Sequence, residues 1–305
     1  MSYETKLAEF SEAIEAGAKV ETQDWMPDEY RRAVLKFIEM HANSEIMGAL
    51  PERECLPKAP SLKRKMSLAA KIQDEVGHAQ LLYRVAEDLG KSREAMYSDL
   101  VNGRSKFHNV FHYPVSHWGD VAIIGWLIDG AALVTQAALL ESSYAPYTRV
   151  LKRICSEEQL HLRHGEDITM ELASGTDAQR AMFQDALDRW WLPIVHFFGP
   201  RSNVAKDLLL HWRVKTRTNE DLRQEFLDRY VPKVLELGFS FPAPVPGRDG
   251  EHWRIRDEDI DWAPLDAIKR NEGPETARRL GLRRRIYEEH RWVREAMSEP
   301  SLHAA

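Results

Sequence analysis

The sequence of 305 residues predicts an all-α protein built on a four-helix bundle, with additional C-terminal helices. Apolar residues recur with a helical period up to about residue 236. Hydrophobic residues make up 43% and charged residues 30% of the chain, which is ordinary for a folded soluble protein. In addition, one arrangement occurs twice: a carboxylate in one long helix, then Glu-x-x-His in the next. We therefore expect four long helices that face one another.

Helix signals define the elements of the first hundred residues. A first long helix is predicted near residues 27–48, where Pro27 followed by acidic residues suits a first turn. The next stretch, "LPERECLPKAP", holds three prolines and is predicted to be a connection. A second long helix begins after the N-cap Ser61 and ends at Gly90, and a short helix follows at 91–102.

The other two helices of the bundle follow in the middle of the chain. "FHNVFHYPVSHWGD" is predicted to be a loop, and a third long helix covers about 118–142. "SSYAPYTR" bends the chain, and a fourth long helix covers about 147–173. Thr176 or Asp177 caps a fifth helix that ends near "FFGP".

The composition changes after two more helices, at about 203–213 and 218–236. "FSFPAPVPGRDG" reads as a linker at about 239–250, and "EHWRIRD" as a short strand or hairpin edge. Helices at about 262–272 and 274–297 precede a polar tail. We therefore expect a helical domain at 1–236 and an extension at 237–305 that packs on the same domain.

Charge, cysteine content and apolar runs exclude several classes of protein. The net charge of −6 gives no broad basic field for nucleic acid. The two cysteines, with no CxxC motif, suit a reducing cytosol. The N-terminus has no signal-peptide core. The longest apolar run, "VAIIGWLI", is too short to cross a bilayer. We predict a cytoplasmic protein that binds neither nucleic acid nor membrane.

The repeated arrangement supplies the candidate metal ligands. Glu45 lies on the first long helix, and Glu75 with His78 begins 30 residues later on the second. Asp129 lies on the third, and Glu158 with His161 begins 29 residues later on the fourth. Residues i and i+3 share one side of a helix. The six ligand candidates are Glu45, Glu75, His78, Asp129, Glu158 and His161.

This donor set is typical of the dinuclear metal site of ferritin-like four-helix bundles, which hold two iron or two manganese ions. Paired transition metals need several hard oxygen ligands and one nitrogen ligand for each ion. The alternative is four amphipathic helices whose polar residues face water. Against it, Asp129 lies within "IGWLIDGAALV", where an unpaired buried charge would cost several kcal/mol.

Three further polar residues adjoin the ligand candidates. Asp74 and Glu157 directly precede Glu75 and Glu158, and they are candidate acceptors for the outer N–H groups of the ligand histidines across the bundle. The alternative is that both are surface acids. Lys71 lies one turn before Glu75 and either pairs with a carboxylate or extends to the surface. The other histidines, His41 among them, lack a matching pattern and are expected to be structural or exposed.

Longer stretches of the chain carry a family resemblance. The matching stretches lie between about residues 22 and 296: "QDWMPDEYR", "HANSEIMGALPE", "APSLKRKMSLAAKIQDEVGH", "IGWLIDGAALV", "SSYAPYTR", "ICSEEQLH", "WWLP" and "WVREA". On these the chain resembles the catalytic A-type subunits of bacterial ring-1,2-phenylacetyl-CoA epoxidases, which are multicomponent di-iron monooxygenases. Val76 and the residue after His78 depart mildly from the pattern expected for that family.

The resemblance implies a reaction and a site. The six ligand candidates would surround two iron ions, and Lys71, Glu52 and Asp129 would act beside or at the centre. The reaction would add one oxygen atom of O2 across two ring carbons of phenylacetyl-CoA and release the other as water. Contacts to the CoA phosphates stay open among several basic residues: Lys63, Arg64, Lys65, Lys106, Arg283, Arg284 and Arg285.

The resemblance also implies partner proteins. The chain has no GxGxxG loop and no cysteine cluster, so electrons from NADPH must arrive through a separate flavin and iron–sulfur reductase. A structural helical C-type subunit, together with a small bridging B-type subunit, completes the expected complex.

Rival functions share part of the pattern. A radical-generating ribonucleotide reductase subunit would be expected to carry a tyrosine four residues after His78, where Leu82 stands. An acyl-carrier desaturase, or a related di-iron oxygenase that acts on another aryl- or acyl-thioester, stays open. An iron store would be shorter, and a purely structural subunit would lack ligands that are all present here.

Overall fold

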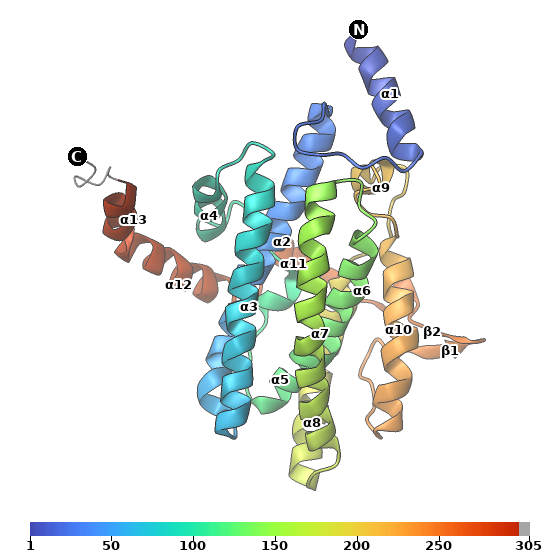
Figure 1. The fold of residues 1–305 in the computed structure, drawn as a ribbon. Helices are drawn as coiled ribbons and strands as arrows, with labels where there is room; N and C mark the ends of the chain where they lie inside the picture. Colours follow the sequence, from blue (N-terminus) through green and yellow to red (C-terminus); the bar gives the residue numbers. More distant parts are fainter. Residues whose placement is uncertain (299–305) are drawn as a thin grey trace.

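The structure, a computed structural model, describes residues 1–298 and is predominantly helical, as Figure 1 shows. The predicted all-α class is confirmed. The polar tail predicted after residue 297 lies, except for Ser298, outside the described residues.

A bundle of four helical segments forms the centre of the molecule. The segments are α2 (Asp28–Cys55), α3 (Leu62–Glu87), α7 (Ala145–Ala173) and the run of α5 (Trp118–Ile123), η3 (Ile124–Ile128) and α6 (Asp129–Leu139). Helix α2 packs on α3, α3 packs on α7, and α7 packs on the α5–η3–α6 run. Ser61 caps α3 through a hydrogen bond to the backbone N–H of Arg64, as predicted.

The first long helix continues further than predicted. Helix α2 runs through Pro51 to Cys55, and only the short η1 (Leu56–Lys58) belongs to the predicted connection. Pro51 removes one backbone hydrogen bond, but Leu50, Pro51 and Glu52 are buried, so packing on both sides keeps the helix intact. As a result Glu52 lies on the same helix as Glu45, about two turns later.

The third long helix contains a feature that the sequence did not predict. Residues Ile124–Ile128 form a π-helical segment, so the predicted helix at 118–142 is interrupted just before Asp129 and ends at Leu139. By length and composition Trp118–Leu139 is apolar enough to cross a membrane, but 72% of its most apolar window is buried inside the molecule. It serves as the central helix of the core.

The remaining helices pack around this bundle. They are α1 (Tyr3–Glu15), α4 (Arg93–Val101), η2 (Asn109–His112), α8 (Asp177–Phe197), α9 (Leu208–His211) and α10 (Asn219–Glu236). Thr176 is the N-cap of α8, which decides between the two predicted caps. The helix predicted at 203–213 is wrong except for α9, because Asp207 caps a single turn there.

The C-terminal part combines a small hairpin with helices. Strands β1 (Gly247–Asp249) and β2 (His252–Arg254) pair antiparallel, which confirms the predicted hairpin edge. Then come η4 (Asp257–Asp259), α11 (Ala263–Lys269), α12 (Thr276–Glu289) and α13 (Arg291–Ser298). The single helix predicted at 274–297 is therefore two helices, separated at His290. In Figure 1, α12 and α13 extend away from the bundle.

His112 joins the C-terminal helices to the bundle. Its Nδ1 lies 2.6 Å from the hydroxyl of Thr276, at the start of α12, and its ring stacks on Phe107 at 3.9 Å between centroids. The backbone N–H of Glu275 also donates to the His112 carbonyl. Burial lowers the pKa of His112 from 6.5 to about 4, so the ring is neutral at physiological pH.

This buried histidine predicts acid sensitivity. Its folded pKa of about 4 lies below the unfolded value of 6.5, so the unfolded chain binds more protons between these values. Stability is then fully present above pH 6.5 and is lost as the pH falls toward 4, by up to about 1.4 kcal/mol per pH unit. Urea unfolding at several pH values should show a shallower pH dependence for His112→Gln than for the wild type. The exposed His211→Gln serves as the control, and an unchanged slope for His112→Gln would contradict the prediction.

Candidate metal centre

Two groups of buried acidic and histidine side chains meet inside the bundle. Ligand atoms of Glu45, Glu75, His78 and Glu158 all lie within 4.8 Å of one another, and so do those of Asp129, Glu158 and His161. Glu158 belongs to both groups. The structure therefore brings together the six residues that the sequence selected, at the distance over which carboxylates and imidazoles share metal ions.

The helical repeat explains this convergence. Helices α3 and α7 each present glutamate and histidine three residues apart, so both side chains point from one face. Glu45 comes from α2, whose continued helical path also carries Glu52 inward. Asp129 directly follows the π-helical segment. A π-helical turn holds one residue more than an α-turn, so this segment sets the direction from which Asp129 enters the site.

The two histidines present one ring nitrogen inward and one outward. The inner Nδ1 of His78 lies 3.2 Å from Glu158 Oε1, and the inner Nδ1 of His161 lies 3.2 Å from Glu158 Oε2. The outer Nε2 atoms lie 2.8 Å from Glu157 Oε2 for His78 and 3.1 Å from Asp74 Oδ2 for His161. An ionised carboxylate only accepts hydrogen bonds, so each Nε2 donates its proton outward. By the same reasoning each Nδ1 also carries a proton, because contacts with Glu158 outweigh burial and raise the pKa of both histidines, that of His78 to about 10. A bound metal ion would replace this proton and take the Nδ1 lone pair.

Each outer contact crosses between helices. Asp74 of α3 holds the histidine of α7, and Glu157 of α7 holds the histidine of α3. Acceptors in these positions fix the orientation of a ligand histidine and raise its basicity. The pair of crossed contacts thus ties α3 to α7 beside the buried carboxylates.

Burial and mutual repulsion dominate the electrostatics of the carboxylates. Burial, followed by the charges of Glu158 and Glu45, raises the pKa of Glu75 well above its usual range. Burial also raises the pKa of Asp129 to about 7, although Lys71 acts in the other direction. Burial would raise the pKa of Glu45, but its close contacts with His41 and His78 outweigh the burial and hold this pKa below its usual value.

Lys71 supplies the one ammonium group at this centre. Its Nζ lies 2.6 Å from Glu52 Oε1 and 2.5 Å from Asp129 Oδ2, and all three side chains are buried. Burial alone would lower the pKa of Lys71, but Asp129 and Glu52 outweigh it and raise this pKa well above the usual range. Lys71 therefore stays charged and holds both carboxylates. The other oxygen of Glu52 is buried without a hydrogen-bond partner.

The residues present fit a pair of metal ions. Nδ1 of His78 is buried with no partner in hydrogen-bond geometry, although carboxylate oxygens lie 3.2 and 3.5 Å away. A cation between these atoms would take the place of the Nδ1 proton, bind the Nδ1 lone pair and reduce the repulsion that raises the pKa of Glu75. Oxygen and imidazole donors, with one carboxylate common to two groups, are the chemistry that paired transition metals use.

One contact residue was missed at the sequence level. His41 was expected to be structural or exposed, but its Nε2 lies 2.9 Å from Glu45 Oε1 and its Nδ1 lies 2.7 Å from the Tyr147 hydroxyl. The available signal was its position four residues before Glu45, which puts both on one helix face. Tyr147 gives no such signal, because only tertiary packing brings it to α2.

A cavity of about 340 Å³ adjoins the carboxylates. Its inner end is formed by the acidic residues Glu45, Glu52, Glu75, Asp129 and Glu158. Apolar side chains, including Phe111, Ile124 and Ile128, form the walls. Its partly exposed lining includes Phe37, Leu209, Lys215 and Asn219. An elongated ligand with an apolar head could thus reach the buried carboxylates from the surface.

The basic clusters singled out in the sequence lie elsewhere. Lys63, Arg64, Lys65, Lys106 and Arg283–Arg285 are absent from the lining of this cavity. Arg64 pairs with Glu171, and Arg283 donates to the carbonyl of Ile46. Lys215, which the sequence did not single out, is the lysine that lines the cavity together with the carboxylates.

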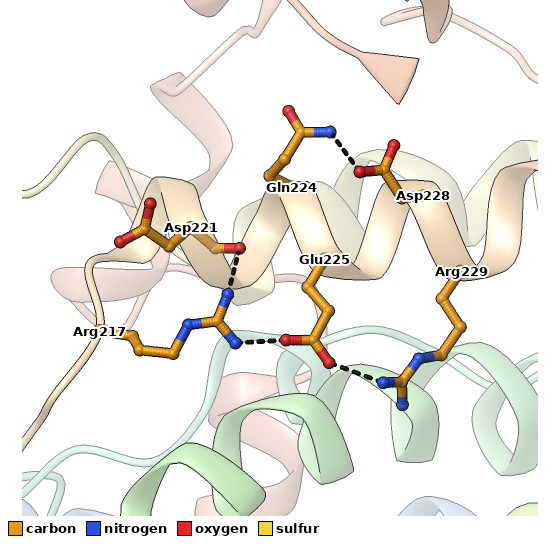
Figure 2. Close-up of a pocket in the computed structure, with 6 residues that line it drawn as sticks. All are labelled: Arg217, Asp221, Gln224, Glu225, Asp228 and Arg229. Carbon is orange, nitrogen blue, oxygen red and sulfur yellow. Dashed lines mark hydrogen bonds and ion pairs between the residues drawn. The ribbon is translucent and has the colours of Figure 1, made fainter. Parts of the chain in front are cut away.

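A second hollow is formed by charged side chains on and beside α10, as Figure 2 shows. It is lined by Arg217, Asp221, Gln224, Glu225, Asp228 and Arg229. Glu225 accepts hydrogen bonds from both arginines, and Gln224 donates to Asp228. These groups are exposed or partly exposed and bind one another by hydrogen bonds, so we assign the chemistry to the buried centre instead.

Comparisons with known proteins find a family and a relative that match nearly the whole chain. The model of a family described as phenylacetic acid catabolic protein matches residues 5–292. The A-type subunit of 1,2-phenylacetyl-CoA epoxidase from Escherichia coli (strain K12) is 43% identical over 296 residues, which is 96% of this chain and 95% of that relative.

The buried lysine predicts a stability effect that does not require metal. Replacing Lys71 with Met leaves Glu52 and Asp129 without their cation, and breaking a buried ion pair in this way costs about 3 kcal/mol. Urea unfolding in EDTA, followed by far-ultraviolet circular dichroism, should show this loss. Lys63→Met, at an exposed position on the same helix, should stay within about 0.5 kcal/mol of the wild type. Equal stability of the two variants would be the contrary result.

Proposed function

The chain belongs to the phenylacetic acid catabolic protein family, and from this we propose that it is the oxygen-activating, catalytic subunit of a 1,2-phenylacetyl-CoA epoxidase. The reaction adds one atom of O2 across two ring carbons of phenylacetyl-CoA, and the other atom leaves as water. The observation that carries the proposal is the apolar cavity that ends at the paired carboxylate and histidine groups.

We propose two iron ions as the cofactor. Glu45, Glu75, His78 and Glu158 would hold one ion, and Asp129, Glu158 and His161 would hold the other. When bound, the iron pair supplies the redox chemistry that activates O2. The crossed contacts from Asp74 and Glu157 keep both imidazoles in the tautomer that can bind metal.

The cavity would bind and orient the substrate. Its apolar walls favour an aromatic ring near the carboxylates and exclude competing water. The thioester and the rest of CoA would extend toward the partly exposed end, where Lys215 and Asn219 lie. Holding the ring against the centre in one orientation converts binding energy into selectivity for one ring edge.

Lys71, Glu52 and Asp129 would act together beside the reacting atoms. The Lys71 ammonium holds a proton 2.5 Å from Asp129 Oδ2 and 2.6 Å from Glu52 Oε1. Its two partners, Glu52 and Asp129, line the inner end of the cavity, so the proton is held directly behind the place where a reaction that forms water needs one. Through its contact with Oδ2, Lys71 also fixes the orientation of the Asp129 carboxylate.

Other proteins must supply the electrons. The chain has neither a GxGxxG loop nor a cysteine cluster, so we propose a separate reductase with flavin and iron–sulfur groups that uses NADPH. The name of the relative designates one lettered subunit, which supports a complex of several different chains. The proposed partners, in the cytoplasm, are a structural helical C-type subunit with a small B-type bridging subunit. A related di-iron oxygenase with another aryl- or acyl-thioester as substrate is the alternative.

The shared ligand gives a direct test of metal and activity. Glu158→Gln should lower iron affinity by about 100-fold and abolish NADPH- and O2-dependent consumption of phenylacetyl-CoA with the partner proteins added. Glu166→Gln, two turns later on the same helix and partly exposed, should keep both. Iron per chain and ring-oxygenated product are the measurements. A loaded wild-type site that turns over a different thioester, but not phenylacetyl-CoA, would favour the alternative substrate.

The cavity wall gives a test of substrate binding. Ala132→Phe should fill the cavity and lower turnover of phenylacetyl-CoA by about 10-fold or more, while iron per chain stays unchanged. Ala137→Phe, at an exposed position on the same helix, is the matched control and should behave as wild type. Undiminished turnover in Ala132→Phe would place the substrate elsewhere.

A further inference from the structure

Two glycines bring the third and fourth helices of the bundle into backbone contact. A Cβ atom added to Gly165 on α7 would lie 2.0 Å from the carbonyl carbon and 2.2 Å from the carbonyl oxygen of Gly125. A Cβ atom added to Gly125, in the π-helical segment, would lie 2.8 Å from the Cα of Gly165. Real side chains do not tolerate such distances, so only glycine permits this crossing.

The crossing lies next to one half of the candidate metal centre. Gly125 is four residues before Asp129, and Gly165 is four residues after His161, so each glycine is one helical turn from a proposed ligand. Both helices are rigid over one turn. The separation of the backbones at the crossing therefore sets how far Asp129 stands from His161 and Glu158.

The length of the Asp129 side chain matches this close approach. Aspartate is one methylene shorter than glutamate, and yet its ligand atom lies within 4.8 Å of those of Glu158 and His161. A short side chain can reach that group only from a nearby backbone. We propose that the Gly125–Gly165 contact is a positioning device that lets an aspartate serve as ligand. It selectively fixes the metal position formed by Asp129, Glu158 and His161, which we call the second metal position. This inference rests on the proposed metal-binding function.

The effect should be confined to one of the two ions. An added methyl group on Gly165 needs about 1.4 Å more space to reach an ordinary contact of 3.4 Å. That movement carries Asp129 away from Glu158 and His161. The segment displaced is the η3–α6 run, which carries Gly125 and Asp129. The group formed by Glu45, Glu75, His78 and Glu158 takes its ligands from α2, α3 and α7, and none from that run.

Anaerobic titration with Fe²⁺ tests whether only one of the two ions is affected. The readouts are iron per chain and melting temperature. Wild-type protein should bind two ions, whereas Gly165→Ala should bind one tightly and the other about 10-fold or more weakly. Gly125→Ala, with its milder 2.8 Å contact, should show a smaller loss at the same position. If Gly165→Ala does not fold, Gly125→Ala decides.

Gly77→Ala is the matched control. Gly77 directly precedes the proposed ligand His78 on α3, but a Cβ atom there meets nothing within 4 Å. This variant should bind two ions like the wild type. A general sensitivity of the bundle to alanine in place of glycine would instead appear in all three variants.

A compensating change separates positioning from loss of structure. Glu at position 129 is longer by about one carbon–carbon bond, so Asp129→Glu should restore the second ion in the Gly165→Ala background. In the wild-type background the same change should crowd Lys71, which lies 2.5 Å from Asp129 Oδ2, and weaken the second ion. Two tightly bound ions in Gly165→Ala, parallel loss of both ions, or failure of Asp129→Glu to restore binding would overturn the inference. A wild-type chain that binds no iron would instead reject the proposed function.

Discussion

The structure depends on the compensation of several carboxylates buried at one place in a helical bundle. Glu45, Glu52, Glu75, Asp129 and Glu158 are all nearly inaccessible to solvent, and an ion moved out of water carries a cost of several kcal/mol unless it is paired. The chain's own cationic groups compensate these charges only in part. Lys71 contacts Glu52 and Asp129, and histidines contact Glu45 and Glu158. Glu75 has the weakest cationic contact, with His161 Nδ1 at 3.6 Å. Burial and the charges of Glu158 and Glu45 therefore raise its pKa well above the usual range. The rest of the centre follows from this residual demand for positive charge, which two metal ions would meet.

Helical geometry meets this demand with few elements. Helices α3 and α7 each turn a glutamate and a histidine inward and place a carboxylate, Asp74 or Glu157, where it holds the histidine of the other helix. The same contacts that orient the proposed ligands therefore also fasten the bundle around them. Stability and function share these residues. Binding of the proposed metal ions would offset part of the free energy required to bury the carboxylates, and would thereby couple the site to folding.

The part of the site that was predictable from sequence is the part encoded by local periodicity. Glu75 with His78, and Glu158 with His161, are recognisable because three residues in a helix return to the same face. Residues whose role arises from tertiary packing were not predictable from the sequence. The helix through Pro51, which carries Glu52 inward, is held by burial against a local preference to stop. The π-helical segment before Asp129 has no sequence signal, and Tyr147 and Lys215 reach the site or its cavity only through the fold. The one missed residue with a local signal is His41, four positions before Glu45.

The two halves of the centre are not equivalent, and the difference lies in Lys71. In the group around Glu45 and Glu75, the direct contacts to the carboxylates come from histidines, and Lys71 adds a longer-range attraction to Glu75. In the group around Asp129, the Lys71 ammonium already lies 2.5 Å from the carboxylate. A cation bound to Asp129 would meet this ammonium as a like charge at short range, and the repulsion would oppose binding more in the group of Asp129, Glu158 and His161 than in the group around Glu45 and Glu75. Close approach of the backbones at Gly125 and Gly165 acts against this repulsion, because it brings Asp129 within reach of Glu158 and His161 as well as of Lys71. In the proposed centre, the affinity of the position formed by Asp129, Glu158 and His161 would thus be set by the balance between a buried lysine and a helix crossing.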